Sequence, residues 1–301
     1  MRRAAAAGLA AFAAGWAWSG HAGGAPASGH SRAAAANLAI LKAPRLAGVS
    51  SFAFAIGDGA LRPGAVTRLG GYGLVVIDGE EARSGLVASL RRRGAVVLGY
   101  LSIGTIERGR PWSAAAWPYR LERWPDWGEW YADTSRRGFR DLIAARVAPR
   151  LLAKGFDGLF VDNVDMVAAH PRQRAGMLAL VRALASAVHA RGGVLFAQNG
   201  EDILARFAPV LDGWNREDVT STYAFGRGRY VRQPAAEIRA AQAALRRWRR
   251  AGLLVTATDY VAAGDRTGSA RSVRTACAAG ALPFVSDIGL RRLPPAPLTC
   301  P

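Results

Sequence analysis

The sequence predicts a mixed α/β protein in which residues 45–301 form a single (β/α)8 barrel. The first observation is an alternation: short apolar runs alternate with stretches that carry apolar residues at helical spacing. The second is that nearly every apolar run ends in a polar or aromatic residue. Eight βα units within ~250 residues favour a closed barrel over an open, doubly wound sheet.

The apolar runs are expected to be parallel strands buried on both faces, because they are nearly continuous rather than alternating. In chain order they span 51–56, 74–78, 95–102, 159–162, 194–198, 211–215, 253–260 and 282–287. Helical spacing is clearest in the intervening stretches 82–93, 139–154, 172–191 and 235–251. Gly155 follows the second of these stretches and suits a helix C-cap.

The first 25 residues predict a secretory signal peptide. Arg2 and Arg3 precede an Ala-rich apolar stretch, and small residues follow it up to Ala25. The stretch is shorter than the ~20 residues of a membrane span, and an uncleaved N-terminal anchor is the alternative. Residues 26–44 are interpreted as a linker. We therefore expect a secreted or periplasmic protein with no membrane attachment after cleavage.

Composition is that of an ordinary globular protein, with 50% hydrophobic and 21% charged residues among 301. The formal net charge is +18, and loss of the two arginines in residues 1–25 leaves +16. The basic residues are dispersed along the chain, and Arg outnumbers Lys 38 to 2, which indicates compositional bias rather than a nucleic-acid site. We expect a monomer without a nucleic-acid partner, metal or cofactor.

Two cysteines, Cys277 and Cys300, are present. An even number of cysteines in an exported protein is compatible with a disulfide bond. Here it would tie the C-terminal tail to the last helix. Two unrelated thiols are an equal alternative.

The most informative segment is 155–165, Gly-Phe-Asp-Gly-Leu-Phe-Val-Asp-Asn-Val-Asp. Its apolar run stops at Asp162, with Asn163 and Asp165 just beyond. Polar groups at the carboxyl end of a parallel strand face the ligand crevice in α/β proteins. The cluster therefore indicates acid/base chemistry, metal binding or hydrogen bonding to a sugar. For Asp162 alone, the alternative is a helix N-cap.

Hydrolysis of a glycosidic bond needs two carboxyl groups, one protonated and one ionised. Asp162 and Glu217, after the fourth and sixth strands, form the leading pair. We assign Asp162 as nucleophile or base and Glu217, on a loop, as proton donor. Glu201 is the competing acid, although it better suits the start of a helix. An exposed Glu217 paired with Arg216 or Arg229 is the alternative.

Other polar residues at strand ends are expected to bind the substrate around one mouth. These are Asp78, Tyr100, Asn163, Asp165, Gln198, Asn199, Asp259 and Tyr260. The long segment 103–137 carries five tryptophans, which form either a platform for sugar rings or a small satellite core. No histidine lies at a strand end, which argues against a zinc or His-based hydrolase.

Taken in order, these motifs resemble the endo-α-1,4-polygalactosaminidase family of glycoside hydrolases, family 114. The resemblance covers about residues 48–290 and rests on short motifs along that range. They are Val-Val-Ile-Asp78, Gly-Tyr100-Leu-Ser-Ile-Gly104, Glu107, Pro125-Asp-Trp127, the 155–165 segment, Gln198-Asn-Gly200, Asp212-Gly with Glu217, and Asp259-Tyr260. The resemblance implies a barrel enzyme whose catalytic Asp and Glu fall on Asp162 and Glu217.

The resemblance also implies a substrate, a partly deacetylated galactosamine polymer. We therefore expect a secreted glycoside hydrolase that cleaves an amino-sugar polysaccharide. A positively charged protein would repel a cationic polymer unless acids at the strand ends make its cleft locally acidic. The rival functions are a carbohydrate-binding barrel without catalysis and a basic surface-adhesion protein.

Overall fold

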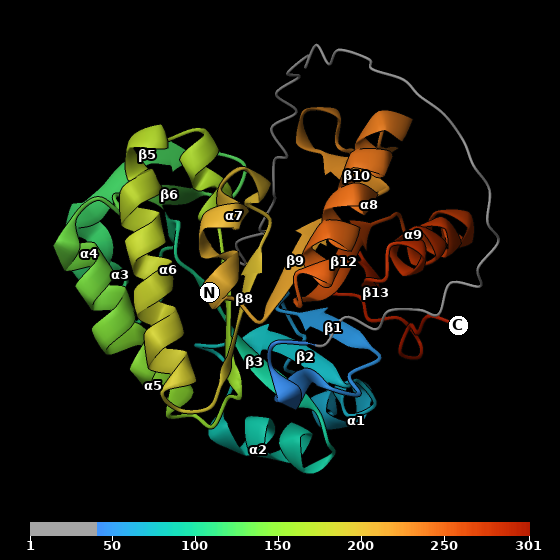
Figure 1. The fold of residues 1–301 in the computed structure, drawn as a ribbon, viewed down its shortest axis with the longest axis horizontal. Coiled ribbons are helices and arrows are strands. Elements are labelled where there is room, and N and C mark those ends of the chain that lie inside the picture. The colour runs from blue at the N-terminus through green and yellow to red at the C-terminus, as the bar shows by residue number, and fades with distance from the viewer. Residues whose placement is uncertain (1–40) are drawn as a thin grey trace, which may run out of the picture.

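The computed structural model describes residues 41–301, and its centre is a sheet of eight parallel strands (Figure 1). The strand order is β1-β2-β3-β7-β8-β9-β12-β13. The bounds are β1 Phe52–Ala55, β2 Leu74–Asp78, β3 Val96–Ser102, β7 Gly158–Asp162, β8 Val194–Gln198, β9 Gly213–Glu217, β12 Leu254–Tyr260 and β13 Leu282–Ser286. The eight predicted runs each correspond to one of these strands, so the predicted alternation is confirmed.

The sheet curls into a nearly closed barrel. Its first and last strands lie side by side, with the rings of Phe52 and Phe284 5.9 Å apart, but the eight-stranded ladder does not continue between them. Phe54, Phe160 and Phe196 fill the interior, with neighbouring rings 5.0 and 6.3 Å apart. Large aromatic side chains thus close the barrel centre and leave polar groups to its mouth.

Helices surround the strands, as Figure 1 shows. Their bounds are α1 Ala65–Leu69, α2 Ser84–Arg92, α3 Ser113–Ala116, α4 Arg137–Leu142, α5 Ala148–Leu152, α6 Arg174–His189, α7 Glu201–Phe207, α8 Ala235–Arg250 and α9 Arg266–Ala278. Five residues of π-helix, Ile143–Val147, join α4 to α5, so the predicted helix 139–154 is interrupted. Short 3-10 helices span Pro44–Leu46, Trp117–Tyr119, Val164–Ala168, Pro171–Gln173, Ala208–Val210 and Phe225–Arg227.

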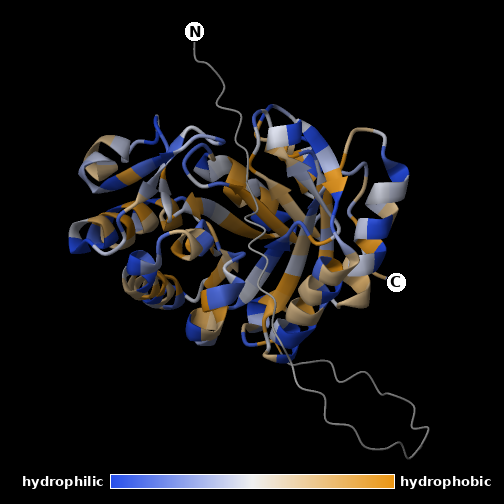
Figure 2. Ribbon diagram, turned by 90° about the horizontal axis from the view of Figure 1, so that it is seen from above, coloured by the Kyte–Doolittle hydropathy of each residue, from blue (hydrophilic) through white to orange (hydrophobic). Residues whose placement is uncertain are grey.

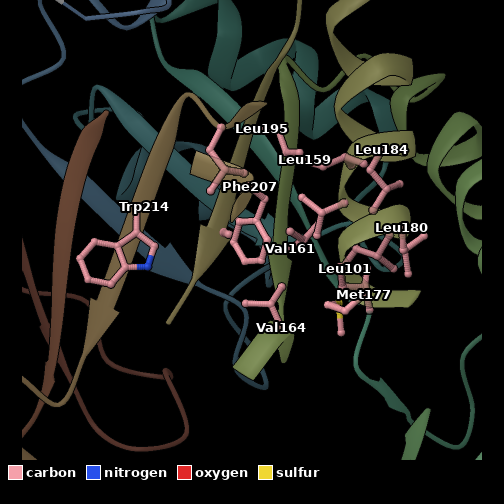
Figure 3. Close-up of a cluster of buried hydrophobic side chains, with 14 of the residues drawn as sticks. Leu101, Leu159, Val161, Val164, Met177, Leu180, Leu184, Leu195, Phe207 and Trp214 are labelled. Carbon is pink, nitrogen blue, oxygen red and sulfur yellow. The ribbon is translucent and has the colours of Figure 1, made fainter. Parts of the chain in front are cut away.

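A second apolar layer lies between the strands and the helices. On β7, Phe160 and Asp162 face the barrel interior, so the period-2 alternation turns Leu159 and Val161 outward. Figure 3 shows these two side chains near Met177, Leu180 and Leu184 of α6. The spacing of the α6 residues places them on one helix face. Figure 2 shows the same arrangement as hydrophobic strands covered by helices of mixed hydropathy.

Two antiparallel sheets follow the carboxyl ends of barrel strands, where the sequence predicted only loops. The segment after β3 forms a three-stranded sheet of β4 Thr105–Ile106, β6 Glu129–Ala132 and β5 Arg120–Trp124, in that order. The segment after β9 forms a hairpin of β10 Ser221–Ala224 and β11 Arg229–Arg232. The rings of Trp127 and Phe225 lie 6.0 Å apart and join the two additions.

The tryptophans of the first addition pack mainly against one another and against arginines. Trp117 and Trp130 meet at 4.8 Å, and the Arg108 guanidinium lies over both rings. Trp124 stacks on Tyr131 at 5.3 Å. These contacts are those of a satellite core, which was one of the two alternatives.

The predicted signal peptide, and residues 26–40 of the predicted linker, lie outside the described residues. The end of that linker already contacts the barrel, because the Lys42 ammonium donates to the Ala208 carbonyl at 2.9 Å. Cys277 of α9 and Cys300 form a disulfide bond with their Cα atoms 5.4 Å apart. Among residues 41–301, no helix has the length and apolarity needed to cross a membrane.

Candidate active site

Strand register collects polar side chains at the carboxyl end of the barrel. Ser102 of β3 lies opposite Asp162 of β7, and Gln198 of β8 lies opposite Asn215 of β9. Below them along the same strands are apolar residues such as Phe160 and Phe196. The period of two therefore turns the last residue of each strand inward above a hydrophobic floor.

Asp162 is buried, with 4% of its surface exposed, and it ends β7. The Tyr100 hydroxyl donates to its Oδ2 at 2.7 Å, and the Asn163 backbone amide donates to its Oδ1 at 2.6 Å. Asn163 has a φ of +60°, a left-handed conformation that Asn tolerates better than most residues. The predicted neighbours Tyr100 and Asn163 thus both hold this carboxyl.

Glu217 is 1% exposed and is the last residue of β9, not part of a loop as predicted from the sequence. The side-chain amides of Gln198 and Asn199 donate to its Oε2 at 2.8 and 2.9 Å. The Tyr260 hydroxyl donates to its Oε1. Because Oε2 accepts from two amides and Oε1 from one hydroxyl, Oε1 has the lone pair left to carry a proton.

The alternative pairing of Glu217 with a loop arginine is wrong. Arg216 instead pairs with Glu201 at 2.6 Å. Glu201 is the first residue of α7, as expected for an acid that meets the N-terminal end of a helix. Asn199 holds Glu217 from a second side, because its Oδ1 accepts from the Glu217 backbone amide at 3.0 Å.

The two carboxyls differ in their affinity for a proton. Burial raises the pKa of Asp162 to about 6, while hydrogen bonds from Tyr100, Asn163 and Gln198 lower it. Burial, and then the negative charges of Asp162 and Asp218, hold the pKa of Glu217 well above its ordinary value. Glu217 therefore keeps its proton to a higher pH than Asp162 does.

The third member of the predicted cluster, Asp165, lies in the 3-10 helix that follows β7. Burial, and then the charge of Asp162, raise its pKa to about 7. Asp218, directly after Glu217, also has its pKa raised to about 7 by burial. Its Oδ1 is buried without a hydrogen-bond partner among the described residues. These acids make the mouth locally acidic when they ionise.

Two acids that were predicted to bind the substrate, Asp78 and Asp259, already form hydrogen bonds with other groups of the protein. Asp78 accepts from the backbone amides of Glu80 and Glu81, and its other oxygen pairs with Arg110 at 2.7 Å. A direct role for Asp78 in binding a sugar finds no support in this geometry.

Asp259 holds the turn that follows Glu217. It accepts from the Thr220 backbone amide and hydroxyl, both at 2.8 Å, and from the Ser221 amide at 3.2 Å. The residue is 2% exposed. Asp259 therefore positions the chain beside Glu217, and its predicted contact with substrate likewise lacks support.

Several residues near Asp162 were not predicted. Glu129 of β6 accepts from the Thr105 hydroxyl at 2.5 Å, and burial raises its pKa to about 7. Glu107 and Asp78 both pair with Arg110. Glu107 and Asp78 belong to motifs seen in the sequence, whereas Glu129 lies on an antiparallel sheet that no strand-end pattern marks, and Arg110 lies in the loop after β4.

A small pocket of about 10 Å³ lies beside Tyr100. Its lining comes from the loop after β2, from β3 and β4 and from the loop after β4, and consists of Glu80, Tyr100, Leu101, Ser102, Thr105, Glu107, Arg110 and Trp112. In residues 41–301, no group of three or more His, Cys, Asp and Glu side chains is arranged to hold a metal ion. Acid/base chemistry by paired carboxyls is what the described arrangement can perform.

The sequence also matches a known family and a known protein. Residues 30–290 match the model of glycoside hydrolase family GH114. An uncharacterised protein from Deinococcus radiodurans is 28% identical over 213 residues, which are 67% of each chain.

Two solved structures share the fold. The glycoside hydrolase domain of PelA from Pseudomonas aeruginosa has a TM-score of 0.71 at 22% identity and covers 82% of this chain and 98% of its own. Aspergillus fumigatus Ega3, solved in complex with galactosamine, has a TM-score of 0.59 at 19% identity, with 83% and 93% covered. At these identities the two structures support the barrel architecture.

Proposed function

The chain belongs to glycoside hydrolase family 114, and we propose that it cleaves a polymer of α-1,4-linked galactosamine. The observation that carries the proposal is the pair of buried carboxyls, Asp162 and Glu217, at the mouth of the barrel, of which Glu217 has the higher affinity for a proton. Different protonation states are what hydrolysis of a glycosidic bond requires. The galactosamine bound in the similar Ega3 structure supports the choice of sugar.

We assign the roles from the hydrogen bonds. Glu217 gives its proton, from Oε1, to the glycosidic oxygen as the bond between that oxygen and the anomeric carbon breaks. Asp162 is ionised and serves as the nucleophile or base on the other side of the anomeric carbon. Gln198 and Asn199 hold Glu217, while Tyr100 and Asn163 hold Asp162.

The charge of the protein affects how strongly it attracts a cationic substrate. A net charge of +18 would repel a cationic polymer, yet the residues around the mouth include Asp165, Asp218, Glu129 and Glu107. Ammonium groups on the polymer favour the ionised form of these acids and are attracted by it. The cleft therefore supplies local attraction where the exterior repels. We further propose that the protein acts after export, as the composition of residues 1–25 indicates.

The proposal is tested with the purified protein lacking residues 1–25 and a partly deacetylated α-1,4-galactosamine polymer. New reducing ends are expected with the unmodified protein. The variants Asp162→Asn and Glu217→Gln keep the side-chain shape, and each is expected to lower kcat by about 10²–10⁴-fold. Circular dichroism checks that both variants remain folded.

Glu201→Gln is the matched control, because Glu201 is the competing acid and is engaged with Arg216. It should leave kcat close to that of the unmodified protein. A large loss in Glu201→Gln with normal turnover in Glu217→Gln would move the proton donor to Glu201. Tight binding of the polymer without any cleavage would favour the non-catalytic carbohydrate-binding barrel.

A further inference from the structure

Glu129 stands at the end of a chain of hydrogen bonds that leads to Asp162. It lies on β6, whose neighbour β4 places Thr105 opposite Tyr131. Thr105 and Glu129 are therefore diagonal neighbours on one face of the small sheet. The Thr105 hydroxyl, fully buried, donates to Glu129 Oε2 at 2.5 Å.

The chain continues from Thr105 to the residue after Asp162. The hydroxyls of Thr105 and Ser102 are 2.6 Å apart. The Asn163 side-chain amide donates to Ser102 Oγ at 2.9 Å and to Thr105 Oγ1 at 3.2 Å. Since Thr105 donates its only hydroxyl proton to Glu129, it is free to accept from both Ser102 and Asn163. An ionised Glu129 thus makes Ser102 the donor in the bond between the two hydroxyls.

Backbone contacts place the segment that carries Thr105 directly against Asn163. The residue has a φ of +60° and is 5% exposed. A Cβ added at Gly104 would lie 1.9 Å from the Asn163 carbonyl oxygen, so only glycine permits this approach. The Ile103 amide donates to the Asp162 carbonyl at 3.1 Å. The segment between β3 and β4 therefore packs directly against the backbone of Asp162 and Asn163.

We propose that Glu129 is a positioning residue: through Thr105 and Ser102 it fixes the side chain of Asn163, and so aims the Asn163 backbone amide at the carboxylate of Asp162. The three-stranded sheet after β3 is then part of the catalytic apparatus through Glu129 and Thr105. The catalytic consequence rests on the proposed function, whereas the structural link between Glu129 and Asp162 does not.

The link is tested first without substrate. The resonance of the Asn163 backbone amide proton in ¹⁵N-labelled protein reports its 2.6 Å bond to Asp162 Oδ1. Thr105→Val keeps the shape of Thr105 and removes its hydroxyl, so this resonance should move upfield. Thr105→Ser restores the hydroxyl and should restore the resonance. An unchanged resonance in Thr105→Val would overturn the proposal.

Activity on α-1,4-galactosamine oligosaccharides gives the second readout. Thr105→Val should lower kcat by about 10- to 100-fold, because a small misplacement of a catalytic group has effects of this size. KM should stay unchanged, and Thr105→Ser should retain most of the activity. Equal losses in Thr105→Ser and Thr105→Val would show that the hydroxyl is not what matters, and would contradict the proposal.

A double-mutant cycle tests whether Glu129 acts through Thr105. Glu129→Gln still offers an acceptor oxygen, but a weaker one than a carboxylate, so its loss in kcat should be smaller than that of Thr105→Val. The Thr105→Val/Glu129→Gln double variant should be no slower than Thr105→Val alone. If the loss in kcat of the double variant equals the product of the two single losses, the two residues act independently, and the proposal is contradicted.

Glu122→Gln is the matched control, because it makes the same change on the same sheet at an exposed residue of β5. It should change neither the Asn163 resonance nor kcat. If the unmodified protein does not cleave the oligosaccharides, the proposed function fails, yet the resonance series still decides whether Glu129 and Thr105 hold Asn163.

Discussion

At the scale of single residues, the two central carboxyls differ because their neighbours differ. Asp162 accepts hydrogen bonds from Tyr100 and from a backbone amide, which favour its ionised form. Glu217 lies beside two further acids, Asp162 and Asp218, whose negative charges favour its protonated form. Burial is the largest cause that raises the pKa of each carboxyl, and the charges of Asp162 and Asp218 raise that of Glu217 further.

This difference predicts the pH dependence of the reaction. The value of kcat/KM should rise as the pH passes about 6, where Asp162 loses its proton, and fall at higher pH as Glu217 ionises. Titration of the substrate amine adds its own contribution, so a variant of the protein gives the sharper measurement. Tyr100→Phe removes a donor to ionised Asp162 and should move the acidic limb upward by about one pH unit.

Glu122→Gln serves as the reference for that shift, since Glu122 is exposed and on a different element. An acidic limb that stays in place in Tyr100→Phe would show that Asp162 is not the group titrating there. A limb displaced to lower pH would contradict the stabilising role of the Tyr100 hydroxyl.

The sequence located residues that end a parallel strand, because strand ends in a barrel meet at one mouth. Asp162, Gln198 and Tyr260 were found in this way. The same argument could not show that Asp78 and Asp259 accept hydrogen bonds from backbone amides of the protein. Those donors lie in loops, and their positions depend on how the loops fold. The sequence therefore predicted where these two side chains lie, but not which groups they hydrogen-bond.

At the scale of elements, the barrel strands were predicted from their continuous apolar character, whereas the antiparallel additions were not. Segment 103–137 mixes tryptophans with arginines, and its aromatic contacts form only after the chain has folded. The ring stacking of Trp124 on Tyr131 and the approach of Trp127 to Phe225 are such contacts. Glu129 was missed for the same reason, since its partner Thr105 lies 24 residues earlier.

The disulfide bond is an element-scale constraint with a testable effect. It joins residues 23 apart, and closing a loop of this length in the unfolded chain is worth about 3 kcal/mol. Replacing Cys277 and Cys300 by serine should lower the free energy of unfolding by about that amount, measured by urea denaturation. Activity should persist, because Cys277 is near the end of α9, which leads into the start of β13, away from the mouth.

A double serine variant as stable as the unmodified protein would show that the bond contributes little beyond the packing of the tail. A loss of activity at full folding would instead link the tail to the mouth. The sequence left the pairing open, because cysteine spacing alone does not reveal whether two Cα atoms approach within bonding distance.

At the scale of the whole molecule, charge is divided between a basic exterior and an acidic mouth. The chain carries 40 Lys and Arg residues against 22 Asp and Glu. Acids at the mouth are nevertheless buried by the closure of the barrel and the sheets above it, and burial raises the pKa of Asp165, Asp218 and Glu129 to about 7. The fold therefore holds protons that the unfolded chain would release.

The sign of the effect on stability follows from these pKa values. In the unfolded chain such carboxyls titrate near ~4, so between pH ~4 and 7 the folded state binds more protons than the unfolded state. Stability must then fall as the pH rises through this window, by up to about 1.4 kcal/mol per pH unit for each group. This direction is opposite to that of carboxyls held in salt bridges, whose folded-state pKa is lowered.

We therefore predict that the melting temperature is higher at pH 5.5 than at pH 8.0, by on the order of 5 °C for a domain of this size. Asp218→Asn should reduce the difference, because it replaces a buried acid by a neutral side chain, and Asn tolerates the φ of +55° found there. Glu122→Gln, at an exposed residue, should leave the difference unchanged. An unmodified protein that melts at the same or a higher temperature at pH 8.0 would show that the buried acids are ionised in the folded state, and the protonated Glu217 required of a proton donor would lose its physical basis.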